Sequence, residues 1–225
     1  AVEPFLRDER SAENKEQLAT LLNDIWANTS KKIADSRKIS LPELNMITDS
    51  LYSYLPNLSL KYKLADQLIQ KSEYDNIIRK KLNIDADKKI NKISFAKYSE
   101  SLESENDGKK IAVLYASGAI YNGKGYDGIY AENFVKEIKK IQKDDDIKAV
   151  VFRINSPGGS ANASDEILFE MQQLKRKKPV IVSFGDYAAS GGYYIAMGAD
   201  KIFSEPNTLT GSIGVFGMIP YFKQI

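Results

Sequence analysis

The stretch Pro179–Asp200 constrains this chain most, because it combines a strand, a tight turn and a helix in one short segment. Three β-branched residues, Val180–Val182, follow a proline and predict a buried strand. Small residues at Ala188–Gly192 then lead into the apolar run Tyr193–Met197, which is typical of a buried helix. Ser190 would begin that helix, where free backbone N–H groups favour negative charge. It is either an N-cap or a nucleophile presented by the turn.

Two absent residue types limit the chemistry open to Ser190. The chain contains no Cys, which excludes thiol nucleophiles, disulfides and thiolate metal sites. It also contains no His, so a Ser-His-Asp triad cannot be built from it. If Ser190 is a nucleophile, its base must be a lysine or a carboxylate. Lysine is the better candidate, because burial can lower the pKa of a lysine toward neutrality.

The first part of the chain predicts a mainly helical segment over residues 1–98. Apolar residues recur at helical spacing in four predicted helices: residues 11–37, a helix from residue 41 onward, residues 64–69 and residues 72–82. Residues 99–110 are polar with almost nothing to bury, and we interpret them as a linker. This linker separates the helical segment from a second domain at residues 111–225.

Residues 111–225 alternate strands with helices, which predicts an α/β domain with a parallel sheet. The predicted strands cover residues 111–115, 147–154, 180 to a break at Gly185 and Asp186, and 201–204. The predicted helices cover residues 131–142 and 163–174. Ligands of such sheets bind beyond the carboxyl ends of the strands. The Gly158–Gly159 turn and the Ser190 turn both leave strands at that end.

The two turns together predict an oxyanion hole more specifically than either does alone. The first turn can offer the N–H of Gly159, and the second can offer the N–H of Gly191. Two N–H groups that converge beside a hydroxyl stabilise the negative charge of acyl-transfer transition states. The alternative is a pair of turns that need glycine only for steric reasons, which leaves the serine between them unexplained.

Three motifs give the chain a resemblance to a known family. Arg153–Ser160, Ala188–Tyr193 and Leu209–Val215 resemble, in this order, the motifs of the signal peptide peptidase A (protease IV) family. That family lies in the Clp-protease and crotonase fold group. The resemblance covers roughly residues 108–220, and Ala1–Phe5 is similar to a segment of the long, duplicated form. It implies that a Clp/crotonase-like second repeat carries the serine, and that the helical segment ends a first repeat.

The resemblance also implies a role for each motif residue. Ser190 matches the nucleophile, and Gly159 and Gly191 match the oxyanion donors. Ser212 matches a serine whose hydroxyl orients the base lysine, although Ser212 is otherwise explained as a turn residue between glycines. The base lysine of the family lies in a Tyr-Lys-Ser-like segment just ahead of the Ala1–Phe5 stretch. We therefore expect the base upstream of this chain, because none of its 32 basic residues falls in that motif.

The function that the resemblance implies is a serine peptidase with a Ser/Lys dyad, which degrades cleaved signal peptides and other apolar peptides. It further implies a homo-oligomer without metal or cofactor, anchored through a segment absent here at the periplasmic face of the bacterial inner membrane. A net charge of +2 gives no reason to expect nucleic acid. The alternatives are a crotonase-like acyl-thioester enzyme, which uses the N–H pair without a nucleophile, and a non-catalytic scaffold of the same fold.

Overall fold

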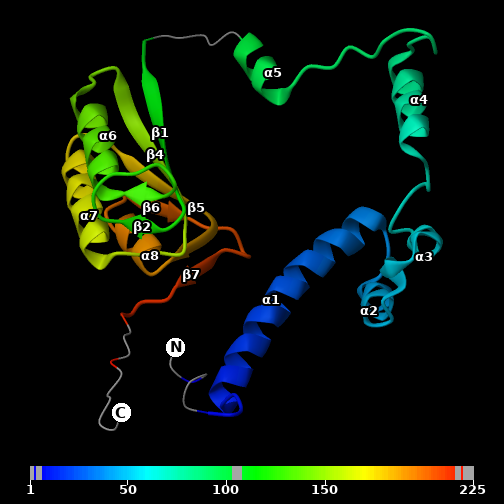
Figure 1. The fold of residues 1–225 in the computed structure, drawn as a ribbon, viewed down its shortest axis with the longest axis horizontal. Coiled ribbons are helices and arrows are strands. Elements are labelled where there is room, and N and C mark those ends of the chain that lie inside the picture. Colours follow the sequence, from blue (N-terminus) through cyan, green and yellow to red (C-terminus); the bar gives the residue numbers. More distant parts are fainter. Residues whose placement is uncertain (1–2, 4–6, 103–107, 216–218, 220–225) are drawn as a thin grey trace, which may run out of the picture. The chain divides into compact units, whose positions relative to one another are not determined.

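The computed structural model describes residue 3, residues 7–102, residues 108–215 and residue 219. The chain divides into two compact units. We call residues 23–105 the helical unit, and residues 106–225 with residues 1–22 the sheet unit. The first helix, α1 (Ala12–Arg37), begins in the sheet unit and ends in the helical unit (Figure 1).

The helical unit is built from short helices around a small core. After α1 it contains α2 (Leu41–Asp49), the 3₁₀ turn η2 (Tyr52–Tyr54), α3 (Pro56–Lys61), α4 (Lys71–Leu82) and α5 (Phe95–Ser101). Its core consists of Ala34, Ile39, Leu44 and Ile47. Ser40 is the N-cap of α2, because its hydroxyl accepts a hydrogen bond from the N–H of Glu43.

The helix predicted over residues 64–69 is wrong, because these residues follow α3 without helical structure. Lys63 has a φ of 61°, a left-handed conformation that commonly ends a helix. The side chain of Arg37 holds the segment beyond it: Nε donates to the carbonyl of Lys63 at 2.6 Å, and Nη2 lies 3.0 Å from a carboxylate oxygen of Asp66. The hydrogen bonds and the charge of Arg37 lower the pKa of Asp66. Contacts distant in sequence thus override the local apolar pattern.

The predicted linker of residues 99–110 overlaps two elements. Helix α5 crosses the expected boundary after residue 98, and its N-cap Ser94 accepts a hydrogen bond from the N–H of Lys97. The first sheet strand already begins at Lys110. Residues 103–107 of the linker lie outside the described residues. The division into the end of one repeat and the start of another stays a prediction.

The main sheet is parallel throughout, with the strand order β1–β4–β5–β6. These strands are β1 (Lys110–Ser117), β4 (Ile147–Ser156), β5 (Val180–Ala189) and β6 (Lys201–Phe203). The short strand β7 (Leu209–Gly211) pairs in parallel with the last residues of β5. A separate parallel pair joins β2 (Ile120–Tyr121) to β3 (Ile129–Tyr130). The predicted α/β class, the parallel sheet and the preceding helices are confirmed.

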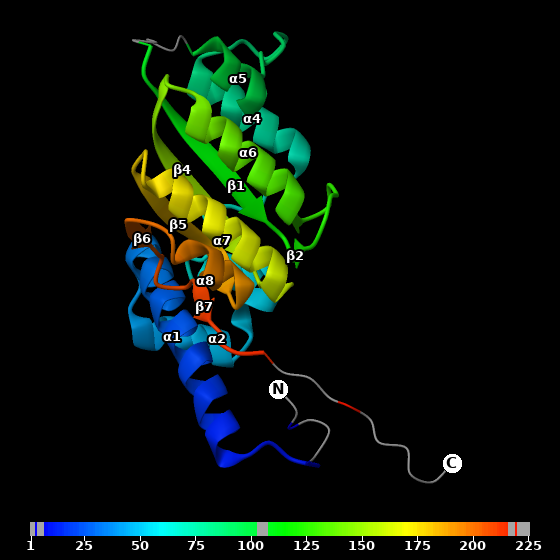
Figure 2. The ribbon, with the colours of Figure 1, turned by 90° about the vertical axis from the view of Figure 1, so that its left-hand side faces the viewer.

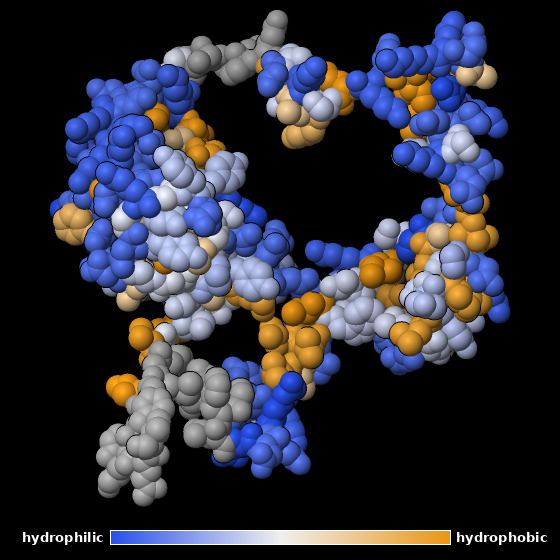
Figure 3. All heavy atoms as spheres, in the orientation of Figure 1, coloured by the Kyte–Doolittle hydropathy of each residue, from blue (hydrophilic) through white to orange (hydrophobic). Residues whose placement is uncertain are grey.

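Two helices, α6 (Ala131–Lys143) and α7 (Ala161–Lys175), cover one face of this sheet (Figure 2). Alternate residues of β4 point into the core between the sheet and these helices, and Val150, Phe152 and Ile154 are fully buried. The surface over the two helices is mostly hydrophilic (Figure 3), as expected for helices with one buried side.

The opposite face of β1 is more open. Its side chains of Ile111, Val113 and Tyr115 are 66%, 49% and 69% exposed. Among the described helices, none has both the length and the apolar character that crossing a bilayer requires.

Strand β5 does not break at Gly185 and Asp186, where the sequence predicts its end. It continues through Gly185 to Ala189, with a shift in its pairing to β4 between Ile154 and Ser156. A side chain at position 185 would lie only 2.9 Å from the side chain of Asn155. Asn155 in turn accepts a hydrogen bond from the N–H of Tyr187 at 3.0 Å. The glycine therefore makes room for a side chain that supports β5, and the extension carries the strand up to Ser190.

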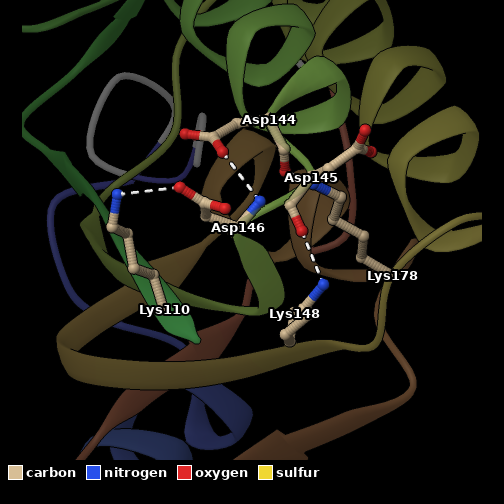
Figure 4. A network of polar contacts seen from close by, with 6 residues as sticks. All are labelled: Lys110, Asp144, Asp145, Asp146, Lys148 and Lys178. Carbon is tan, nitrogen blue, oxygen red and sulfur yellow. Dashed lines mark hydrogen bonds and ion pairs between the residues drawn. The ribbon is translucent and has the colours of Figure 1, made fainter. Parts of the chain in front are cut away.

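Lys178 is a buried cation, 8% exposed, between the end of α7 and the start of β5. Its ammonium donates to the carbonyl of Ile141 at 2.6 Å and to the carbonyl of Asp144, the C-cap residue of α6. Figure 4 shows its side chain beside the turn of residues 144–146. Because the last carbonyls of a helix have no partner within the helix, this cation satisfies groups that burial would otherwise leave unpaired.

Replacing Lys178 by Met should lower the free energy of unfolding by about 1–3 kcal/mol, because two carbonyl groups lose their donor. Urea unfolding of the chain measures this loss. The matched control is Lys177→Met, which changes an exposed neighbour and should stay within about 0.5 kcal/mol of the unmodified chain. Equal losses in the two variants would contradict a capping role for Lys178.

Candidate active site

Ser190 lies between β5 and α8 (Gly191–Ala196) in a backbone conformation that few residues adopt. Its φ is 50° and its ψ is −120°, which for a residue other than glycine costs about 1–3 kcal/mol. Backbone hydrogen bonds on both sides hold it there. Its N–H donates to the carbonyl of Gly211 in β7 at 2.8 Å, and its carbonyl accepts from the N–H of Tyr194 in α8 at 2.9 Å. A sharp strand-to-helix turn of this kind presents a serine hydroxyl at the end of a sheet.

The hydroxyl of Ser190 makes no capping hydrogen bond to α8. Serines that do cap helices in this chain are recognisable by that bond: Ser40 accepts from Glu43, and Ser160 accepts from the N–H of Ala163 at 3.3 Å. The N-cap interpretation of Ser190 is therefore not supported. Its side chain is half-buried and is left available for another partner.

The turn after β4 is shaped by a backbone bridge to Ile120. The N–H of Ile120 donates to the carbonyl of Gly158 at 2.9 Å, and its carbonyl accepts from the N–H of Ser160 at 2.8 Å. Because successive residues of an extended segment point their N–H groups to opposite sides, the N–H of Gly159 faces away from Ile120. This is the group that the sequence assigns to the oxyanion hole.

The two turns touch each other through glycines. A side chain at Gly158 would lie 2.7 Å from the backbone nitrogen of Gly191 and 2.8 Å from Cβ of Ser190. A side chain at Gly191 would lie 3.2 Å from the backbone nitrogen of Gly159 and 2.6 Å from Oγ of Ser164. The structure thus brings the backbone nitrogens of Gly159 and Gly191 close to each other and to Ser190.

A pocket of about 680 Å³ opens beside Ser190. Gly159 and Gly191 form part of its lining, together with Asp165 of α7 and Tyr194 of α8. Further walls come from Met197 and from the segment after β7, mainly its residues Ile213 and Val215. A cavity of this size and apolar character, next to a hydroxyl and two backbone donors, fits an extended side chain of a substrate.

Ser212 follows the residue that binds the N–H of Ser190. It has a φ of 50° and is exposed, and no hydrogen bond of its hydroxyl occurs among the described residues. Gly211 on one side pairs with Ala189 in β5, and Ile213 on the other side lines the pocket. The hydrogen bond between the N–H of Ser190 and the carbonyl of Gly211 therefore brings Ser212, the next residue, near Ser190. The role of the Ser212 hydroxyl stays a prediction.

No lysine occurs among the described residues that line the pocket, where Asp165 carries the single carboxylate. Tyr194 donates a hydrogen bond to Asp165 at 2.9 Å, and this bond raises the pKa of Tyr194 because ionisation would remove it. The described residues contain no cluster of three or more side chains suited to hold a metal ion.

Comparisons with known proteins bear on the same segments. Residues 172–225 match the model of peptidase family S49. Protease 4 of Salmonella typhi is 36% identical over 97% of this chain and 37% of its own length. Protease 4 of Haemophilus influenzae is 36% identical over 100% of this chain and 38% of its own. The resemblance to the signal peptide peptidase A family is confirmed.

Two further similarities extend the comparison. A putative signal peptide peptidase SppA of Enterococcus faecium is 41% identical over 56% of this chain and 39% of its own length. A solved membrane-bound stomatin-specific protease is 26% identical over 52% of this chain and 53% of that chain, with a TM-score of 0.41. This chain spans less than two fifths of the length of the two protease 4 relatives.

Several residues that shape the pocket beside Ser190 belong to none of the three sequence motifs. Ile120 orients the N–H of Gly159, yet it lies in a strand too short to give a pattern. Asp165 and Tyr194 meet only because α7 packs against α8. Gly158 belongs to the motif Arg153–Ser160, but the sequence does not show its close approach to the serine turn, which depends on the fold.

The contact between the turns predicts a large difference between two glycine substitutions. Gly158 has a φ of 103° and meets backbone atoms, so Gly158→Ala should cost about 3 kcal/mol or more. Gly123 has a φ of 74°, but a side chain there would come no closer than 3.8 Å to Glu132. Gly123→Ala should therefore cost only about 1 kcal/mol. Urea unfolding compares the two, and equal costs would show that the turns are not in tight contact.

Proposed function

We propose that this chain carries the nucleophile of a serine peptidase with a Ser/Lys dyad, in which Ser190 attacks the peptide carbonyl. The observation that carries the proposal is the hydroxyl of Ser190, which is held in a strained turn without capping α8. The neighbouring backbone nitrogens of Gly159 and Gly191 support it. Similarity to protease 4 over the whole chain supports the reaction class.

The proposed reaction assigns one role to each group. A lysine outside the described pocket wall takes the proton of Ser190, and Oγ forms a bond to the carbonyl carbon. The carbonyl oxygen becomes negative and accepts hydrogen bonds from the N–H groups of Gly159 and Gly191. The amine then leaves with a proton from the lysine, and water hydrolyses the acyl-enzyme to restore Ser190.

The proposed substrates are cleaved signal peptides and other apolar peptides. The pocket beside Ser190 supports this, because Met197, Ile213 and Val215 give it an apolar lining. From the resemblance we further propose a homo-oligomer anchored at the periplasmic face of a bacterial inner membrane. The exposed apolar side chains of β1 are available for contacts with other subunits or other parts of the protein.

A crotonase-like enzyme is the rival function, since it would use the same N–H pair to hold a thioester enolate. It would have no need for a strained serine beside that pair. The observation that Ser190 bears the strain without forming a cap favours the peptidase.

Substituting Ser190 by Ala should lower peptide hydrolysis by the complete protein at least about 1,000-fold, because the covalent nucleophile is lost. The free energy of unfolding should change by less than about 0.5 kcal/mol, since no capping bond is removed. Steady-state kinetics and urea unfolding measure the two effects. A serine-directed covalent inhibitor should label the unmodified protein and not the variant.

The matched control for this variant is Ser40→Ala, which removes a serine that does cap a helix. It should cost about 1 kcal/mol of stability and leave hydrolysis unaffected. Near-normal turnover by the Ser190 variant would contradict the proposed nucleophile, and labelling that persists in the variant would place the reactive hydroxyl elsewhere.

Ser212→Ala should lower kcat about tenfold or more, because a base lysine that loses its orienting hydroxyl is less well aimed at Ser190. The melting temperature should hardly change, since Ser212 is exposed. Ser204→Ala, which also alters an exposed serine, serves as the control. If kcat is unchanged, or falls only because the protein unfolds, Ser212 is a turn residue.

A further inference from the structure

The pocket beside Ser190 contains an acidic group within an otherwise largely apolar lining. Asp165 projects from α7, and one of its carboxylate oxygens accepts the hydrogen bond from the hydroxyl of Tyr194 at 2.9 Å. That bond fixes the carboxylate on the wall where α7 meets α8. The pocket-lining residues that the structure describes include no lysine or arginine, and none of the ion pairs between described residues involves Asp165.

A carboxylate can accept several hydrogen bonds, so Tyr194 does not exhaust the capacity of Asp165. The residue is exposed, which leaves the carboxylate open to a ligand that enters the pocket. The part of the lining that comes from Met197, Ile213 and Val215 suits an alkyl chain, while Asn162 and Ser164 add polar groups. A largely apolar pocket with one carboxylate in its lining matches a side chain with a long hydrocarbon stem and a cationic tip.

We propose that Asp165 lets this pocket take a lysine or arginine side chain in addition to apolar ones, and disfavours acidic ones, at the residue whose carbonyl Ser190 attacks. The proposal rests on the peptidase function proposed above and adds a charge preference to its apolar substrates. The two are compatible, because signal peptides combine an apolar segment with a basic one. A glutamate in the same position would meet the like charge of Asp165 and be disfavoured.

The test uses the complete protein and three peptides that differ only in the residue before the cleaved bond: lysine, norleucine or glutamate. Norleucine matches the stem of lysine without its charge. Asp165→Asn should lower the ratio of kcat/KM for lysine over norleucine by about two- to fivefold, as expected for an exposed charge pair. The same variant should raise the ratio for glutamate over norleucine.

Two further variants separate the carboxylate from its surroundings. Glu166→Gln removes the next acidic residue of α7, which does not line the pocket, and should leave both ratios unchanged. Tyr194→Phe removes the hydroxyl that fixes the carboxylate but keeps the charge of Asp165, so the lysine-to-norleucine ratio should fall less than in Asp165→Asn. A fall as large as that in Asp165→Asn would assign recognition to the hydroxyl and overturn the proposal.

Each result bears on one of the two proposals. Ratios that are the same in Asp165→Asn and in the unmodified protein overturn the role of Asp165, while cleavage of the peptides still supports the peptidase. Failure of the unmodified protein to cleave any of the three peptides in a Ser190-dependent manner instead contradicts the peptidase function, and the charge preference with it.

Discussion

The close approach of two backbone turns is the constraint on which the rest of this site depends. Gly158 lies against the backbone nitrogen of Gly191 and the Cβ of Ser190, at distances that leave no room for a side chain. The same approach brings together the two N–H groups that can stabilise an oxyanion. Because interiors are closely packed, even a methyl group between the turns would have to displace backbone atoms.

Packing and hydrogen bonds within the sheet hold the two turns close to each other. Strand β5 reaches Ser190 because Gly185 leaves space for Asn155, whose side chain binds the backbone beyond it. On the far side, Gly211 in β7 accepts the N–H of Ser190 and sustains its strained conformation. Strain of this kind persists only where several contacts determine the backbone together, which is the situation between these strands.

The pocket beside Ser190 has two kinds of wall. Backbone from the two turns forms one part of it, whereas side chains from α7, α8 and the segment after β7 form the other. These walls can vary in polarity and charge without disturbing the turns. Asp165 is an example of such a wall residue, since its carboxylate adds a negative charge to a largely apolar cavity and accepts one hydrogen bond from Tyr194.

The sequence by itself determined the α/β class, the order of the four main strands with the helices α6 and α7 between them, and the motifs around Ser190, because these follow from local periodicity and from glycine spacing. Tertiary structure decided what local patterns do not encode. Residues 64–69 form no helix, and Arg37 binds Lys63 and Asp66 across the chain. Ile120 orients the N–H of Gly159, and packing of α7 on α8 joins Asp165 to Tyr194. Such contacts link residues distant in sequence, so only the folded chain brings them together.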